Sequence, residues 1–451
     1  MAVEKYLELF EKRTTKSRQH WEEAKRYLAG GVSGGAGFLR PHPVYIADAK
    51  GSKFVDIDGN EYIDLLLGGF PNILGHSPSV ITEAVKKQLD HGTAVGISTE
   101  LQIKLAKKIN KYMPHIELVR FVNTGSEANL FACRVARSWT GKDKIAKFEG
   151  GYNGQYDEQL ISGISGRTLG SADRPEPVAD CAGIPKFVLD NAIILPYNNP
   201  DATVSIIKEH ANELAAVLIE PVAGFGMGGI PVEKEFMKAL RKITEGNNVL
   251  LIFDEVVTAF RVGGLGGAVK YYGVKPDLAS FGKPVGGGMS IGAYGGRRDI
   301  MEKCVSPTVD PLQDAEYKIF QSGTFTGNPI TMTAGLACLT ELAGKDYSYI
   351  DNLAEKVRVG LRRIAAEQGF AVQITGMASM FCVHFTSYPI SDQRTHNKAD
   401  KAKNYEFSLG MIVNGVWLAP MHTAAICFAH TAKEIDYILN VAESVLKEMK
   451  R

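Results

Sequence analysis

The sequence lacks several features that mark whole classes of protein. Its six cysteines are scattered, and none forms the Cys-x-x-Cys spacing typical of zinc sites or the pattern of a disulfide framework. The formal net charge is only +1, so no excess of one sign indicates a nucleic-acid or membrane-surface partner. No apolar run approaches the length that would span a bilayer. We therefore expect a reduced, cytoplasmic setting, with no metal, no nucleic acid and no membrane.

What the chain does contain is typical of a globular protein. It has 451 residues, of which 45% are hydrophobic and 22% charged, and this length is enough for roughly two or three domains. The first residues, Met1 to Arg13, are charged throughout. That composition favours neither a signal peptide nor an acid-poor transit peptide.

The hydrophobic pattern predicts three regions. Residues 1–75 combine helical spacing with a β-hairpin that turns at Asp58-Gly59-Asn60, and residues 329–451 form a smaller α+β domain. In residues 76–328, helices alternate with short apolar runs: 118–122, 144–148, 192–195, 215–219 and 249–253. Buried runs separated by helices indicate an α/β domain with a mainly parallel sheet, in which ligands bind at the carboxyl ends of the strands.

The most informative residue is Lys283. It leaves a strand-like segment and runs into three glycines, in the sequence Asp-Leu-Ala-Ser-Phe-Gly-Lys-Pro-Val-Gly-Gly-Gly from 277 to 288. An amine held close to backbone can be desolvated and can form a Schiff base. Most lysines are solvated, however, so the argument depends on the residues around it.

Two acids follow buried strands. Asp254 comes directly after the run 249–253, and Glu220 after 215–219. A carboxylate at the end of a buried strand is costly unless a cation or a donor meets it. Each could also be a helix cap or a salt-bridge partner, but together with Lys283 they place two acids and an amine at one edge of the sheet.

Three loops at the same edge could complete a ligand site. The sequence Asn123 to Asn129 opens a helix, where Gly125 and Ser126 could bind an anion such as phosphate through backbone N–H groups. A plain capping box involving Ser126 and Asn129 is the alternative. Tyr152 lies in the loop 150–154, and the polar loop 321–329 could supply hydroxyls. An amine, an acid, an aromatic ring and an anion nest are the complement of pyridoxal phosphate.

With these motifs in order, the chain resembles the class III aminotransferases of the type I pyridoxal-phosphate fold. The resemblance falls in the branch of glutamate-1-semialdehyde aminomutases and β-amino-acid aminotransferases. It implies a large domain with a mainly parallel, seven-stranded sheet and a smaller α+β C-terminal domain. The motifs that carry it cover nearly the whole chain: 59–64, 74–76, 124–128, 151–152, 220–222, 254–258, 260–261, 282–283, 286–288 and 323–329.

The resemblance also implies a role for each matching residue. Lys283 would bind the cofactor as a Schiff base and then move the substrate proton, and Asp254 would pair with the pyridine nitrogen. Val256 and Tyr152 would cover the two ring faces. Further positions have roles in the phosphate site and near the substrate: Gly125 and Ser126 would bind the phosphate, Thr324 would complete the phosphate site of the neighbouring subunit in a homodimer, and Glu220 matches an acid whose role varies.

The chain departs from the family pattern at several positions. Asn153 replaces the usual histidine after Tyr152, and Ala259 replaces a glycine. The substrate-binding arginine of aminomutases aligns with Gly37; Arg40 could substitute for it or could anchor the loop. The segment Met421 to Phe428 lacks the acid that aminomutases carry there and is shorter.

Three functions remain open from the sequence. We place first a transaminase that moves an amino group from a small-molecule donor, including a β-amino acid, to a carbonyl acceptor. The alternative is an intramolecular aminomutase acting on glutamate 1-semialdehyde or a relative, with residues 162–184 as a gating lid. The third is a non-catalytic scaffold, although such proteins typically lose the lysine or the aspartate.

Overall fold

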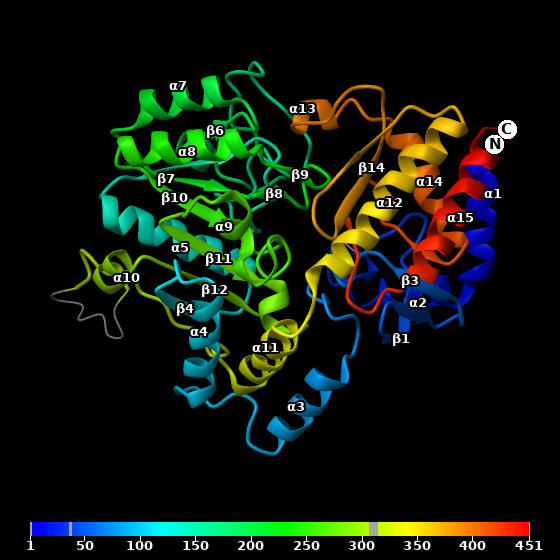
Figure 1. Cartoon of the computed structure of the whole chain (residues 1–451), viewed down its shortest axis with the longest axis horizontal. Helices are drawn as coiled ribbons and strands as arrows, with labels where there is room; N and C mark the ends of the chain where they lie inside the picture. Colours follow the sequence, from blue (N-terminus) through cyan, green and yellow to red (C-terminus); the bar gives the residue numbers. More distant parts are fainter. Residues whose placement is uncertain (1, 36–37, 306–313, 451) are drawn as a thin grey trace.

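The computed structural model describes residues 2–35, 38–305 and 314–450, which form two lobes (Figure 1). One lobe contains a seven-stranded sheet with the strand order β4-β12-β11-β10-β7-β5-β6. All neighbouring strands are parallel except β12, which is antiparallel to β4 and β11. In sheet order, the strands are β4 (Leu118–Val122), β12 (Gly292–Gly296), β11 (Leu278–Gly282), β10 (Leu250–Asp254), β7 (Leu214–Ile219), β5 (Lys144–Phe148) and β6 (Ala192–Leu195). The predicted α/β class with a mainly parallel, seven-stranded sheet is therefore confirmed.

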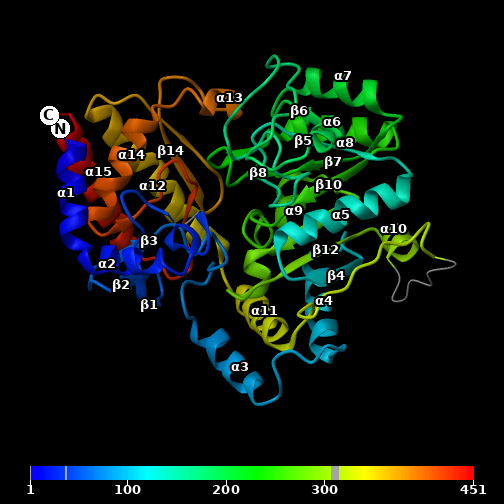
Figure 2. The same cartoon turned by 180° about the vertical axis from the view of Figure 1, so that it is seen from behind.

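The five apolar runs correspond to β4, β5, β6, β7 and β10 within one residue at each end. Strands β7 and β10 are buried along their whole length, as expected for a sheet covered on both faces. Helix α5 packs across the sheet (Figure 2) and α8 packs on β10. The helices of this lobe are α3 (Ser79–Leu89), α4 (Glu100–Tyr112), α5 (Gly125–Thr140), α6 (Lys186–Asp190), α7 (Pro200–His210), α8 (Lys234–Gly246), α9 (Gly267–Tyr272), α10 (Arg298–Cys304) and α11 (Pro329–Leu342).

Strand β12 did not emerge from the sequence pattern. Three of its five residues are glycine, and glycine is depleted in ordinary strands. The structure explains the composition, because a Cβ on Gly292 would lie 1.9 Å from the carbonyl oxygen of Thr124, and one on Gly295 would lie 2.2 Å from that of Leu118. Close backbone approach, and not β-propensity, selects these residues.

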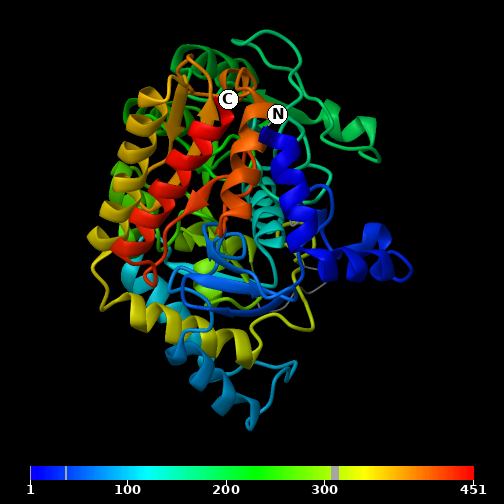
Figure 3. The same cartoon turned by 90° about the vertical axis from the view of Figure 1, so that its right-hand side faces the viewer.

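The second lobe joins the two ends of the chain. Strand β15 (Val416–Trp417) pairs in parallel with β3 (Glu61–Asp64), and α1 (Ala2–Arg13) packs on α14 (Lys401–Val413). Figures 1 and 3 show the N- and C-terminal ends side by side. Its other elements are α2 (Thr15–Ala24), β1 (Ile46–Lys50), β2 (Lys53–Asp56), α12 (Tyr347–Glu367), β13 (Val372–Thr375), β14 (Met380–Phe385), α13 (Gln393–His396), β16 (Ala424–Ala425) and α15 (Ala432–Met449).

The hairpin β8 (Val222–Ala223) and β9 (Ile230–Pro231) projects toward this second lobe. The predicted domain boundaries, after residues 75 and 328, remain predictions. Within the described ranges, no helix is both long and apolar enough to cross a membrane.

Candidate active site

The predicted site residues meet in one cavity at the carboxyl ends of the central strands. The cavity has a volume of about 360 Å³, within the range of small-molecule sites, about 300–1,000 Å³. Seven residues singled out in the sequence line it: Gly125, Ser126, Tyr152, Glu220, Asp254, Val256 and Lys283. They come from the start of α5, from the last residue of β10 and from the segments that follow β5, β7, β10 and β11.

Lys283 begins a single 3₁₀ turn directly after β11. Its backbone has a φ of 49°, a left-handed conformation that is costly for a residue with a side chain and is often found at functional sites. Its Nζ lies 5.6 Å from the ring centroid of Phe70 and has no hydrogen bond or ion pair within the part of the chain that the structure describes. Burial lowers the pKa of the Lys283 amine, while Asp254 and Glu220 oppose that shift. A larger neutral fraction makes the amine a better nucleophile.

Asp254 is held by a set of donors. Its Oδ2 accepts hydrogen bonds from Nδ2 of Asn129 at 2.7 Å and from Nδ2 of Asn153 at 2.9 Å. Its Oδ1 accepts one from the N–H of Val256 at 3.1 Å. Burial raises the pKa of Asp254, and these bonds oppose the rise. Ser280 Oγ also lies 3.5 Å from Oδ1, but the single hydroxyl proton is directed to Asn129 Oδ1 at 2.5 Å. Because Oδ2 already receives two amide donors, Oδ1 is therefore the oxygen with a free lone pair for a further donor.

Two members of this network were not singled out as site residues in the sequence. Asn129 is nearly fully buried, and its Oδ1 accepts a hydrogen bond from Ser280 Oγ at 2.5 Å. Asn129 lies three residues after Ser126 on the same helix, so the helical spacing gave a signal that could have identified it. Asn153 was noted only as a departure from the family pattern, yet it donates directly to Asp254.

Glu220 fixes the backbone beside the predicted stacking residue. Its Oε1 accepts the N–H of Tyr152 at 2.8 Å, and its Oε2 accepts the N–H of Gly224 at 3.0 Å. Burial, followed by repulsion from Asp254, raises the pKa of Glu220 to about 8.

The start of α5 combines a capping box with free N–H groups. Thr124 is the N-cap: its Oγ1 accepts the N–H of Glu127 at 3.1 Å, and the Glu127 carboxylate accepts the N–H of Thr124 at 3.2 Å. The alternative interpretation of this segment, a capping box of Ser126 and Asn129, is therefore wrong, because the box consists of Thr124 and Glu127. The N–H groups of Gly125 and Ser126 pair with no other described residue, and both residues line the cavity. The cap and an anion nest therefore coexist at this helix terminus.

Val256 requires the glycines that surround it. A Cβ on Gly125 would lie 2.7 Å from Val256 Cγ1, and one on Gly282 would lie 3.1 Å from the same atom. These contacts fix the Val256 side chain between the start of α5 and the residue before Lys283.

An aromatic series borders the cavity and was not predicted. The ring of Tyr152 lies 4.8 Å from that of Phe225, which lies 4.8 Å from the ring of His422. His422 in turn stacks on Phe70 at 5.8 Å, so the series ends beside the Lys283 amine. Nδ1 of His422 lies 2.7 Å from the carbonyl oxygen of Thr423, which requires the proton on Nδ1 when the ring is neutral.

The remaining predicted residues lie outside this cavity. Arg40 is exposed, and its backbone carbonyl accepts a hydrogen bond from the Tyr405 hydroxyl at 3.0 Å. Thr324 is also exposed, in a turn before α11. Neither residue lines the cavity, and Gly37 lies outside the described residues.

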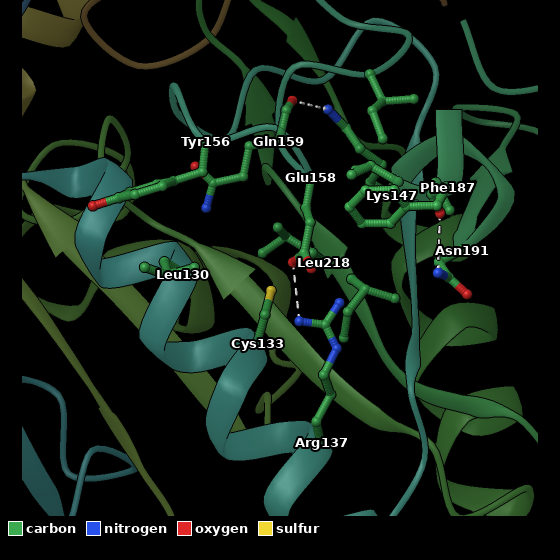
Figure 4. A pocket seen from close by; sticks show the side chains of 14 residues that line it. Leu130, Cys133, Arg137, Lys147, Tyr156, Glu158, Gln159, Phe187, Asn191 and Leu218 are labelled. Carbon is green, nitrogen blue, oxygen red and sulfur yellow. Dashed lines mark hydrogen bonds and ion pairs between the residues drawn. The ribbon is translucent and has the colours of Figure 1, made fainter. Parts of the chain in front are cut away.

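A buried lysine elsewhere in the sheet, Lys147, shows which surroundings are specific to Lys283. Lys147 of β5 points into a small cavity of about 60 Å³ between α5, β5 and α6 (Figure 4). Its Nζ donates to the carbonyl oxygen of Gln159 at 2.6 Å, and burial lowers the pKa of Lys147 to about 8. Neither the anion nest of α5 nor the Asp254 carboxylate lines this cavity. Burial of an amine is therefore not sufficient to make a cofactor site.

The residues of the larger cavity fit pyridoxal phosphate. The cavity is lined by an available amine, a carboxylate with a free lone pair, two unpaired N–H groups and an aromatic ring. In that order, these groups match the aldehyde, the ring nitrogen, the phosphate and the ring face of the cofactor. Together with the mainly parallel sheet, this set defines an enzyme of the type I pyridoxal-phosphate fold.

Comparison with known proteins identifies the family. The model of the family described as aminotransferase class III matches residues 38–440, and the chain belongs to that family. It is 40% identical over 443 residues to a glutamate-1-semialdehyde 2,1-aminomutase of Thermodesulfovibrio yellowstonii, covering 97% of this chain and 100% of that protein. As in the rest of this family, its cofactor is pyridoxal phosphate.

Solved transaminases have the same fold. An omega-transaminase from Sphaerobacter thermophilus superposes with a TM-score of 0.89 at 33% identity, covering 96% of this chain and 98% of that one. A beta-phenylalanine aminotransferase from Variovorax paradoxus superposes with a TM-score of 0.85 at 30% identity, covering 98% and 96%.

Proposed function

We propose that the chain is an intramolecular aminomutase that converts glutamate 1-semialdehyde, or a close relative of it, into the isomer with the amino group on the neighbouring carbon. The observation that supports this best is the end-to-end similarity to the aminomutase of T. yellowstonii. The sequence analysis placed a transaminase first and the aminomutase second, and the similarity favours the second.

We assign the residues of the cavity different roles in binding the cofactor and in moving the proton. Bound pyridoxal phosphate supplies an aldehyde that condenses with amines and a ring that withdraws electrons. Lys283 would bind the cofactor through Nζ, and the same amine would then move the proton at the substrate carbon. The remaining residues would hold the cofactor: Asp254 the ring nitrogen, Gly125 and Ser126 the phosphate, and Tyr152 and Val256 the two ring faces.

The proton step depends on the electrostatics around Lys283. A neutral amine is needed to accept a proton, and burial lowers the pKa of Lys283 toward that state. The nearby acids keep the pKa from falling further, so the amine can also return the proton. A base with an intermediate pKa suits a reaction in which a proton is removed from one carbon and delivered to another.

A transaminase remains the second candidate because of one segment. Met421 to Phe428 contains no acid, and His422 takes part in the aromatic series beside Lys283. Arg40, the proposed substitute for the substrate-binding arginine, is exposed. A substrate pocket with these residues fits an amino donor and a carbonyl acceptor other than the semialdehyde.

The functional unit is proposed to be a homodimer. Thr324 is exposed and does not line the cavity of its own chain, and the neighbouring Phe325 and Phe320 have 58% and 69% of their surface exposed. Large apolar side chains exposed together are typical of interaction surfaces.

Incubation of the purified holoenzyme with glutamate 1-semialdehyde alone separates the two candidates. An aminomutase forms 5-aminolevulinate with no added donor, whereas a transaminase requires a donor and releases a carbonyl product from it. Absence of 5-aminolevulinate, together with keto-product formation from an amino donor, would reject the aminomutase in favour of the second candidate. The Lys283→Ala protein is the control for non-enzymatic isomerisation.

A further inference from the structure

Helix α13 of the second lobe reaches the loop that carries Tyr152. Its Arg394 forms a bidentate ion pair with Glu149, with Nε to Oε2 at 2.8 Å and Nη2 to Oε1 at 2.9 Å. Glu149 directly follows β5 and is only 4% exposed. Arg394 is the cation that pairs with this buried carboxylate in the part of the chain that the structure describes.

The segment between Glu149 and Tyr152 has little freedom to move. A Cβ on Gly150 would lie 2.5 Å from Met227 Sδ and 2.6 Å from Oε1 of Gln393. The N–H of Tyr152 is itself bonded to Glu220. We therefore expect a displacement of Glu149 to move the Tyr152 ring, because Gly150 is packed against Met227 and Gln393.

The same guanidinium also holds the 162–184 segment. Arg394 donates from Nη1 to the carbonyl oxygen of Gly170 at 3.0 Å and from Nη2 to that of Leu169 at 2.9 Å. Asn397, which follows α13, adds a bond from its Nδ2 to the carbonyl oxygen of Gly166 at 2.7 Å. One side chain thus joins α13, the 162–184 segment and the base of the Tyr152 loop.

We infer that Arg394 is a positioning residue for the amino-transfer reaction: it sets the Tyr152 ring and the 162–184 segment in one fixed arrangement. The inference rests on the proposed role of Tyr152, but not on the choice between aminomutase and transaminase. The planar, five-donor guanidinium is suited to this task, because it meets a carboxylate and two carbonyls at once.

The test compares Arg394→Gln and Arg394→Lys with a matched control, Arg241→Gln. Arg241 also donates to a buried carboxylate, Asp277, at 2.8 Å, and neither residue lines the active-site cavity. Asp277 keeps a second guanidinium partner, Arg297, at 2.9 Å. The control therefore reports the effect of losing one guanidinium from a buried acid that still has a cation. Three quantities are measured: visible circular dichroism of the bound cofactor, kcat and KM, and the rate of tryptic cleavage of the holoenzyme after Arg167.

We expect Arg394→Gln to change the visible circular dichroism, to accelerate cleavage after Arg167 and to lower kcat by about ten- to a hundredfold, since a misplacement of about 1 Å can cost on the order of 10²-fold in rate. Arg394→Lys should lie between this variant and the wild type. The inference is overturned if Arg394→Gln loses thermal stability as Arg241→Gln does but keeps the dichroism, kcat and cleavage rate within twofold of the wild type.

Two further variants keep the test decisive. If Arg394→Gln does not fold, Glu149→Gln removes the same ion pair while preserving side-chain shape, and the same dichroism and kcat outcomes apply to it. Arg394 keeps its bonds to the carbonyl oxygens of Leu169 and Gly170 in that variant, so its cleavage rate should stay near that of the wild type. Tyr152→Leu tests the proposed ring role separately. Unchanged dichroism in that variant would reject the role of Tyr152, and the cleavage rates would then decide the role of Arg394 toward the 162–184 segment.

Discussion

Lys283 and Lys147 show that the surroundings of a buried amine decide its chemistry. Lys147 is buried near the end of β5 and Lys283 is half-buried directly after β11, and desolvation lowers the pKa of both amines. Lys147 donates to a backbone carbonyl in a small cavity, whereas Lys283 opens onto a cavity that also contains Asp254 and the start of α5.

This difference gives a paired prediction. Lys283→Ala should abolish the visible absorbance of the lysine-bound cofactor, because no other described amine lines the cavity. Lys147→Met should keep that absorbance, since methionine fills a similar volume without a charge. Absorbance spectra of the two purified variants check this. If Lys147→Met lost the absorbance band and Lys283→Ala kept it, the assignment of Lys283 as the cofactor-binding lysine would be wrong.

Asn153 gives a second prediction at this scale. Asn153→Leu removes one of the two amide donors to Asp254 Oδ2, and a hydrogen bond to a charged group contributes about 1.5–3 kcal/mol. We expect a fall in kcat of about tenfold or more, with weaker cofactor binding, because an Asp254 with a higher pKa keeps the ring nitrogen protonated less well. Asn153→His, which restores the usual family residue and a donor, should stay within severalfold of the wild type. Equal activity in both variants would contradict this role.

At the scale of single elements, the sequence predicted strands better than it predicted caps and close contacts. Apolar runs identify buried strands directly, which is why β4, β5, β6, β7 and β10 were found within one residue at each end. The N-cap of α5 was misplaced, because several residues near a helix start can accept a backbone N–H and only the backbone angles select Thr124. Strand β12 was missed, because its glycines are chosen by contacts distant in sequence.

The junction of α13 with β14 predicts acid sensitivity. Nδ1 of His396 lies 3.3 Å from Nδ1 of His384, so the two rings share one proton at this contact. Burial lowers the pKa of His384 to about 3 and that of His396 to about 4. Since the unfolded pKa is about 6.5, the unfolded chain binds more protons below that pH, and stability falls as pH falls from about 6.5 toward 4.

His396→Gln should reduce this loss. At pH 5 the contribution of one such histidine is up to about 2 kcal/mol, from about 1.36 kcal/mol for each pH unit below 6.5. We therefore expect the drop in Tm between pH 7 and pH 5 to be smaller in His396→Gln than in the wild type. His20→Gln, at an exposed position, is the control and should show the wild-type drop. An identical drop in all three proteins would exclude the His384–His396 contact as a source of acid sensitivity.

At the scale of the whole molecule, the order of the motifs along the chain predicted the family and the large sheet. The predicted substrate-binding and inter-subunit residues, however, are not brought into the cavity within a single chain. The cavity holds the predicted cofactor residues, whereas Arg40 and Thr324 lie outside its lining. In the structure of a single chain, a residue that acts in the site of a second subunit can be recognised only by its exposure. The arrangement of Thr324 is therefore tested best with two chains.

Co-expression of two inactive variants tests whether Thr324 acts in the site of the neighbouring subunit. Lys283→Ala disables a site through its own chain, and Thr324→Asp should disable the partner's site by placing a negative charge beside the phosphate. If Thr324 serves the neighbouring subunit as proposed, the site with intact Lys283 in a mixed dimer receives intact Thr324 from its partner. Co-expression in equal amounts should therefore restore about a quarter of the wild-type sites, since half of the dimers are mixed and each has one intact site.

The control pairs Lys283→Ala with Asp254→Asn. Both residues line the cavity of their own chain, so every site in the mixed dimer keeps one defect, and no activity should return. Recovery is measured as cofactor absorbance and turnover of the co-purified dimer carrying two different tags. If Thr324 instead served its own subunit, the mixed dimer of Lys283→Ala and Thr324→Asp would contain no intact site. Its activity would then match that of the control.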